Sequence, residues 1–277
     1  MINICYCADN KLFKQLLISV VSLVDKTDET LNIINLTLEL PSFIKGSKKN
    51  SPEQDRVLDN YVKQKNPNSR FKSIDVSNMF EKELLKGPNI HNRFYCYFIC
   101  TRLLMDKIPE LGDKAIYLDC DVIFHDDIKK LWEIDVENFD FAGRHDWLRS
   151  PNYLQSGVMI MNLEEMRKDK SMQRTRDYVT NKKIHAMLDM TALNRACKKK
   201  KRISSKLLPY FYKEKCIAHH ICALTKFANI PLLRFLILTG LLHRIKPDEF
   251  DKMKKYQPQY TNLINKVEQI LADNENI

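Results

Sequence analysis

The sequence predicts an α/β fold, in which helices pack on the faces of a buried sheet. Short apolar runs typical of buried strands alternate with segments of helical periodicity through about the first 200 residues. The 277 residues are 44% hydrophobic and 29% charged, which is typical of a globular protein large enough to bury a substantial core. No internal repeat or low-complexity segment interrupts the pattern.

The first elements are expected to alternate in order along the chain. They are a strand over residues 1–8, a helix over 11–24, a strand over 31–40, a helix over 51–65 and a strand over 71–76. The first strand leads into its helix through Asp9 and Asn10. Ligands of α/β sheets bind at such loops, so Asp9 is either a ligand-binding residue or a helix cap.

An amphipathic helix is predicted over residues 91–105, and it carries Arg102 among apolar neighbours. A buried guanidinium needs an anionic partner. That partner is either a structural carboxylate or a phosphate of a ligand.

The most informative stretch is the apolar run from Ala115 to Leu118, which ends at Asp119 and Asp121. Residues two apart on an extended backbone point the same way, so both carboxylates face one ligand. Like charges this close repel and tend to retain protons unless a cation lies between them. Oxygen ligands of this kind suit Mg²⁺ or Mn²⁺. The alternative is that these residues only cap the next helix.

The middle of the chain continues the alternation. A short capped helix is expected over residues 126–132, and then a strand over 139–143 with a loop after it that holds Asp146. A buried strand over 153–162 follows, which opens with the polar turn Gln155-Ser156-Gly157. After it come a long charged helix over 163–182 and a helix that begins at Asp189.

The last third differs in character. A short strand from residue 216 opens into a loop with His219 and His220, and Lys226 follows. Residues 230–246 are apolar and flanked by bases, but too short and interrupted to span a bilayer. They either lie in a membrane interface or dock on the domain as an ordinary helix. An amphipathic helix is expected over residues 260–271.

Charge and cysteine content narrow the function classes. The formal net charge of +10 favours anionic partners. We interpret the basic run at residues 198–202 as a solvated helix end or loop. Six glycines and no P-loop lysine motif exclude a glycine-rich phosphate loop. The eight cysteines form no CxxC pair and the N-terminus resembles no signal peptide, so we expect reduced thiols and a cytoplasmic protein.

Four ordered features together resemble the family 8 retaining glycosyltransferases, which include bacterial lipopolysaccharide galactosyl- and glucosyltransferases and glycogenin. These features are Ala8-Asp9-Asn10, Tyr117-Leu-Asp119-Cys-Asp121, Gln155-Ser-Gly-Val with Asn162, and Asp189 with Asn194; the pair His220 and Lys226 is a weaker fifth. The resemblance implies a GT-A fold, a Rossmann-like mixed sheet flanked by helices. It implies a catalytic domain at residues 1–227 and a helical, basic C-terminal extension at residues 228–277.

The resemblance also implies an activity. A hexose would pass from UDP-glucose or UDP-galactose to a glycan or lipid-linked saccharide of the lipopolysaccharide type, an EC 2.4.1 reaction. Mn²⁺ or Mg²⁺ would be held by Asp119, Asp121 and His220. The donor nucleotide and diphosphate would be bound by Cys7, Ala8, Asp9, Asn10, Arg102, Asp119, Cys120, Asp121, Ser156 and Lys226. The donor sugar would lie among the catalytic residues Gln155, Asp189 and Asp146.

We expect a cytoplasmic protein; where residues 230–246 lie in a membrane interface, it would be peripheral at the inner face of the membrane, with an anionic surface as a partner. No nucleic acid is expected to bind.

The chain departs from the family pattern at several positions. Met190 and Thr191 stand where the family has Gln and Asp, so the amide near the anomeric carbon is missing. Gln155 or Asp189 would then stabilise that face, or UDP itself would guide the acceptor. Gln155 replaces the usual Asn, and the ending after His220 lacks the family's Gly and Pro-Trp. We prefer His220 to His219 as a ligand because its spacing to Lys226 fits.

Two other functions compete with this one. A non-catalytic basic protein that binds nucleic acid or anionic lipid would account for the net charge, although no recognised module is present. A metal-dependent phosphohydrolase is compatible with the acidic pair, but no second carboxylate cluster for a two-metal centre is evident.

Overall fold

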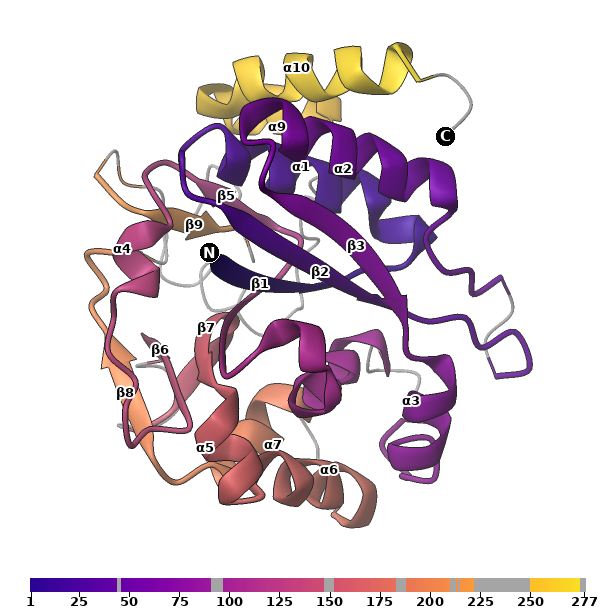
Figure 1. Cartoon of the computed structure of the whole chain (residues 1–277), viewed down its shortest axis with the longest axis vertical. Helices are drawn as coiled ribbons and strands as arrows, with labels where there is room; N and C mark the ends of the chain where they lie inside the picture. Colours follow the sequence, from indigo (N-terminus) through magenta and orange to yellow (C-terminus); the bar gives the residue numbers. More distant parts are fainter. Residues whose placement is uncertain are drawn as a thin grey trace.

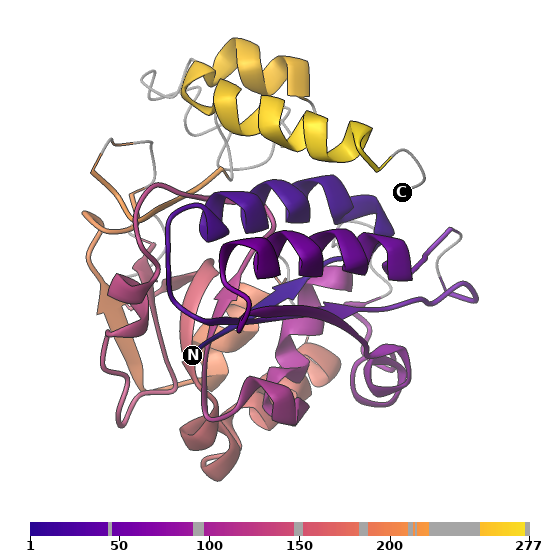
Figure 2. The ribbon, with the colours of Figure 1, turned by 45° about the horizontal axis from the view of Figure 1, so that its top comes forward.

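A seven-stranded sheet forms the centre of the protein, with helices on both of its faces (Figures 1 and 2). The computed structural model describes residues 1–43, 46–90, 97–146, 152–182, 188–209, 213, 215–221 and 250–274. The strand order is β3-β2-β1-β4-β7-β6-β8. The strands are β1 Ile2–Cys7, β2 Leu31–Thr37, β3 Arg70–Asp75, β4 Lys114–Leu118, β6 Phe141–His145, β7 Leu154–Asn162 and β8 Lys200–Ile203.

The N-terminal half is a parallel sheet with helical crossovers, as the sequence predicts. β1 pairs in parallel with both β2 and β4, and β2 pairs in parallel with β3. The crossovers are α1 Phe13–Val24 and α2 Pro52–Lys65, and the 3-10 turn η1 Asn10–Leu12 precedes α1. A capping box between Ser51 and Gln54, with proline in the first turn, starts α2.

The second half reverses direction. β7 runs antiparallel to β4 and β6, and β8 pairs in parallel with β6 at the sheet edge. The helices α5 Leu163–Lys168, α6 Ser171–Asn181 and α7 Leu188–Ala196 follow β7 and cover the face opposite α1 (Figures 1 and 2). The short elements are α3 Ser77–Glu83, η3 Pro109–Leu111, β5 Val122–Phe124, α4 Lys129–Trp132 and β9 Ala218–His220.

Two expected helices have a different form. In the part of residues 91–105 that the structure describes, the chain is a 3-10 helix, η2 Tyr97–Lys107. Seven of the ten residues from Phe98 to Lys107 are buried, so the sequence here lacks the regular alternation of apolar and polar faces that marks an α-helix. The single helix expected over residues 163–182 is two helices, because Lys170 adopts a left-handed conformation with φ 54°.

Four loop or turn predictions were wrong because strand pairing extends further than the apolar pattern. The loop expected to hold His219 and His220 is one of them, since both residues belong to β9. Arg144 and His145 belong to β6, and Gln155-Ser156-Gly157 belongs to β7 rather than to a turn. The basic run at residues 198–202 lies largely in β8 and not in a helix end or loop. An edge strand can direct charged side chains outward while a residue such as Ile203 is buried.

The C-terminal helices α9 Phe250–Tyr256 and α10 Thr261–Ala272 pack on the outer side of α1, separated by the turn η4 Pro258–Tyr260 (Figure 2). Buried Ile264 and Val267 join the same apolar core as α1, which confirms the amphipathic helix expected at residues 260–271. This cover explains why α1 is buried almost throughout. The apolar segment at residues 230–246 lies outside the described residues, and the boundary at residue 227 stays a prediction.

No helix among the described residues is long and apolar enough to cross a membrane. Six cysteines in this part of the chain are free thiols, and five of them are buried.

Candidate metal centre at the end of the central strand

The acidic pair lies where the sequence places it. All four residues Ala115 to Leu118 of β4 are buried, and Asp119 follows directly. The Asp119 N–H donates to the carbonyl of Gly157 at 2.8 Å, which ties the end of β4 to β7. Asp121 then lies in the tight turn before β5. Both carboxylates are partly exposed at the carboxyl end of a central strand.

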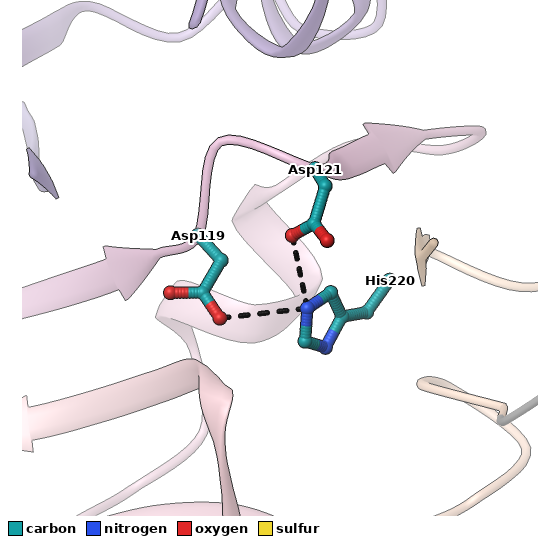
Figure 3. A group of neighbouring side chains, drawn as sticks. All are labelled: Asp119, Asp121 and His220. Atoms are coloured by element: carbon teal, nitrogen blue, oxygen red, sulfur yellow. Dashed lines mark ion pairs between the residues drawn. The ribbon is translucent and has the colours of Figure 1, made fainter. Parts of the chain in front are cut away.

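His220 reaches the acidic pair through a second, two-stranded sheet. β9 pairs antiparallel with β5 so that His220 lies opposite Val122, and the Ile221 N–H donates to the Asp121 carbonyl at 2.8 Å. The Nε2 atom of His220 is 2.9 Å from Oδ1 of Asp121 and 3.4 Å from Oδ2 of Asp119. Figure 3 shows both carboxylates flanking the imidazole.

These three side chains offer ligand atoms that all lie within 4.8 Å of one another. In the described part of the chain, no other trio of His, Cys, Asp or Glu side chains converges in this way. The pairing of β5 with β9 thus brings together the three metal ligands that the family resemblance implies.

Gly157 provides the space that His220 occupies. A Cβ atom at this position would lie 2.2 Å from Cε1 and 2.3 Å from Nδ1 of the His220 ring. Any other residue would therefore displace the imidazole or the strand. This role was not predicted from the sequence, although a glycine inside a buried strand is a recognised sign of close approach.

One oxygen of Asp119 is held by the protein, and the other faces the site. Oδ1 accepts hydrogen bonds from Nη2 of Arg102 and from the Tyr117 hydroxyl, both at 2.7 Å. The Arg102 guanidinium also lies 4.2 Å from the centre of the Tyr117 ring. This arrangement fixes the carboxylate and leaves Oδ2 directed at His220. Tyr117 was not among the predicted site residues.

Arg102 connects the candidate metal centre to α7. It is only 4% exposed, and its Nη1 lies 3.2 Å from the carboxylate of Asp189 and 2.9 Å from the carbonyl of Ser156. Burial alone would lower the pKa of Arg102, but the charges of Asp119, Tyr117 and Asp189 raise it above its ordinary value. The structure thus gives Arg102 structural carboxylate partners.

Asp189 lies in the first turn of α7, beside this arginine. Burial raises the pKa of the Asp189 carboxyl, and the charge of Arg102 opposes that shift. The neighbouring Met190 is buried at 8% exposure, and the Thr191 hydroxyl lies 2.7 Å from that of Tyr153. Asn194, later in α7, exchanges two hydrogen bonds with the backbone of Leu154 and so fixes α7 to β7.

The loop after β1 lies close to the acidic turn, since Cys120 Sγ is 3.5 Å from the carbonyl of Cys7. The backbone of Ala8 exchanges hydrogen bonds with the amide of Asn35, at 2.8 and 3.1 Å. Asn35 was not predicted as a site residue; a polar side chain in the fully buried β2 was the available signal.

Asp9 and Asn10 have local partners. The Asp9 carboxylate accepts from the N–H groups of Lys11 and Leu12, so it caps the following turn. The Asn10 side chain is 3.5 Å from that of Gln54 in the capping box of α2. Neither contact involves the acidic pair.

Gln155 and Arg144 lie on the other side of His220. Nη2 of the buried Arg144 donates to Oε1 of Gln155, and the two residues line, with His220, a small pocket that opens to solvent. Asp146 is buried at the end of β6, where its N–H donates to the Tyr153 carbonyl at 2.7 Å. Lys226 lies outside the described residues.

Comparison with solved structures identifies the fold. The structure of the galactosyltransferase LgtC in complex with donor and acceptor sugar analogues matches with a TM-score of 0.58 and 15% identity, over 88% of this chain and 98% of that one. The bifunctional glycosyltransferase WbbM matches with a TM-score of 0.64 and 14% identity, over 80% of this chain and 46% of that one. The fold is therefore the GT-A fold of glycosyltransferases, as predicted.

The sequence comparisons show the family: residues 3–207 match Glycosyl transferase family 8, and the chain belongs to that family. General stress protein A of Bacillus subtilis (strain 168) is 28% identical over 138 residues, 45% of this chain and 46% of that protein. The protein named Probable galacturonosyltransferase-like 4 of Arabidopsis thaliana is 25% identical over 205 residues, 66% of this chain and 55% of that protein. The chain thus spans about half the length of these curated relatives.

Proposed function

We propose that this protein is a metal-assisted retaining glycosyltransferase that moves a hexose from a UDP-sugar to a saccharide acceptor. The observation that carries the proposal is the convergence of Asp119, Asp121 and His220 at the end of the central strand of a GT-A fold. Membership of glycosyl transferase family 8 supports the same class of reaction.

The donor set fits a divalent transition metal. Two carboxylates and one imidazole provide two negative charges and a nitrogen ligand, which suits Mn²⁺ better than Mg²⁺ because imidazole is a ligand of the softer ion. Three protein ligands also leave coordination positions for phosphate oxygens. When bound, the ion would neutralise the carboxylates and stabilise the negative charge that develops on the departing diphosphate.

The surrounding residues would position the donor. The backbone of residues 7–10, with Asn35 behind it, would hold the nucleotide beside Cys120. Arg102 would keep Asp119 and Asp189 in a fixed arrangement next to the sugar. We assign the remaining donor contacts to Ser156 and Lys226.

Three polar side chains would lie around the reacting sugar, which develops positive charge as the bond to phosphate breaks. Asp189 would stabilise that charge across the ring, since Met190 provides no amide at the neighbouring position. Gln155 and Asp146 would contact the sugar hydroxyls.

The donor would be UDP-glucose or UDP-galactose, and the acceptor a glycan or lipid-linked saccharide of the lipopolysaccharide type. The name of the Arabidopsis relative adds UDP-galacturonate as a donor to test. The buried Arg144, which lines the pocket beside His220, favours including this acidic sugar. A cytoplasmic location at the inner membrane face would bring the enzyme to a lipid-linked acceptor.

The proposal is tested by UDP release from each of these UDP-sugars in the presence of Mn²⁺ or Mg²⁺. Asp121→Asn keeps the shape of the side chain but removes a charged ligand, and we expect it to lower turnover by at least a hundredfold. Asp28→Asn is the matched control, because this carboxylate is 95% exposed and pairs only at the surface, at 3.1 Å from Lys65. Wild-type turnover in Asp121→Asn, or in excess chelator, would contradict the proposal.

A further inference from the structure

Tyr260 joins the C-terminal helices to the ribbon that carries His220. Its hydroxyl is 2.7 Å from Nδ1 of His219 and 3.2 Å from Nε2 of His125. Its ring stacks on that of His219, with centroids 6.3 Å apart and planes at 26°. Tyr260 is 2% exposed and His219 is fully buried, so this contact is shielded from water.

Both histidines belong to the ribbon formed by β5 and β9. His219 lies within β9 opposite Ile123, and His125 follows β5, where its N–H donates to the carbonyl of Ile217 at 2.9 Å. Successive residues of a strand point to opposite faces. His219 therefore faces Tyr260, while His220 faces the two aspartates.

The helices that carry Tyr260 are themselves anchored. Ile264 and Val267 of α10 are buried against the core of α1, and Lys266 forms an ion pair with Asp25 at 2.7 Å. The ribbon of β5 and β9 is also anchored to α1, because the Ser22 hydroxyl of α1 accepts a hydrogen bond from the N–H of Phe124 in β5 at 3.1 Å. Tyr260 thus links the C-terminal helices to the ribbon of β5 and β9, and both of these parts contact α1.

We infer that Tyr260 is a positioning residue of the metal centre, which acts through His219 to hold His220 at the distance from Asp119 and Asp121 that a shared cation requires. A phenolic hydroxyl donates one hydrogen bond and accepts others, so it can satisfy both imidazoles when one accepts and the other donates. The inference rests on the proposed function, because it assumes that the three ligands bind a metal.

The experiment measures Mn²⁺ binding to the 277-residue chain directly, by titration calorimetry without donor. Tyr260→Phe keeps the ring and removes the hydroxyl, and we expect about fivefold weaker Mn²⁺ binding, the effect of one lost buried hydrogen bond. In turnover assays the Mn²⁺ concentration for half-maximal activity should rise by the same factor, with kcat unchanged at saturating Mn²⁺.

Tyr61→Phe is the matched control. The Tyr61 hydroxyl donates to Asp25 at 2.7 Å, and Lys266 of α10 lies 5.2 Å from the centre of its ring. This substitution therefore perturbs the same helix interface without contacting the ribbon. We expect a lower Tm with unchanged Mn²⁺ affinity.

A second pair of variants tests the same link if Tyr260→Phe does not fold. His219→Asn offers an amide in place of Nδ1 and should retain most of the affinity, whereas His219→Ala should not. Equal affinities in this pair, or wild-type affinity in Tyr260→Phe, would overturn the positioning role alone. A wild-type chain that binds no Mn²⁺ would overturn the metal centre of the proposed function, and this role with it.

Discussion

Gly157→Ala is the sharpest test of the proposed metal centre, because it changes a residue that is not itself a proposed ligand. The added Cβ would lie 2.2 Å from Cε1 of His220. Carbon atoms in contact are normally about 3.5 Å apart, so the ring must move by roughly 1.3 Å. Metal ligands tolerate errors of about 0.2 Å, and His220 would therefore leave the ligand set.

We expect Gly157→Ala to weaken Mn²⁺ binding by roughly ten- to a hundredfold, the range seen when the support of a metal ligand is lost. Calorimetric titration of the metal gives the affinity, and thermal unfolding gives the stability of the same sample. The fold should persist because an alanine in a strand has no intrinsic conformational penalty relative to glycine.

A double-mutant cycle separates the clash from other effects. His220→Ala removes the ring with which the new Cβ would collide. In that background Gly157→Ala should have no further effect on Mn²⁺ affinity, whereas in the wild type its effect is large. The reasoning is refuted if Gly157→Ala binds Mn²⁺ as the wild type does, or if the two effects simply add.

Two further predictions concern stability. Burial, with a contribution from the charge of Lys26, lowers the pKa of His125 to about 4 from its ordinary 6.5. Between these two pH values the unfolded chain binds a proton that the native chain does not. The free energy of unfolding should therefore fall as the pH drops from about 6.5 toward 4. After a discount for partial exposure, we expect the free energy of unfolding to fall by about 1 kcal/mol between pH 7 and 5. Urea unfolding at the two pH values measures this fall, which should be absent in His125→Gln. Arg176 is 2% exposed and lies 2.6 Å from Asp106. Because Arg176→Met leaves the buried charge of Asp106 without this partner, it should lower the free energy of unfolding by about 3–5 kcal/mol, which thermal melting measures. The nearby Arg174→Met breaks a surface ion pair with Asp169 and a hydrogen bond to its carbonyl, and it should lower the free energy of unfolding by less than about 1 kcal/mol. Equal losses in the two variants would show that burial does not set the cost of breaking these pairs.

The first half of the fold was predictable because its signals are local. Apolar alternation and capping residues mark β1, α1, β2, α2, β3 and β4 with small errors at the ends. The break at Lys170 was not predictable, because a lysine in a left-handed conformation has no distinctive sequence signal. β8 was missed for another reason: an edge strand rich in lysine resembles a solvated loop.

The site divides in the same way. Asp119 and Asp121 were evident from one stretch of sequence, since strand geometry alone turns them toward one ligand. His220 depends on the pairing of β5 with β9, a contact between distant segments that only the resemblance to a family could suggest. Gly157 and Tyr117 act through their distance to other site residues, and no periodicity in the sequence reports such distances.

The pairing of β5 with β9 also sets the time at which the protein acquires its ligand set during synthesis. Chains are made from the N-terminus, and the parallel strands β1 to β4 can pair while the rest is still being translated. Residue 220 emerges much later, and Tyr260 later still. A nascent chain on the ribosome would therefore hold a nearly complete sheet without a functional cation site.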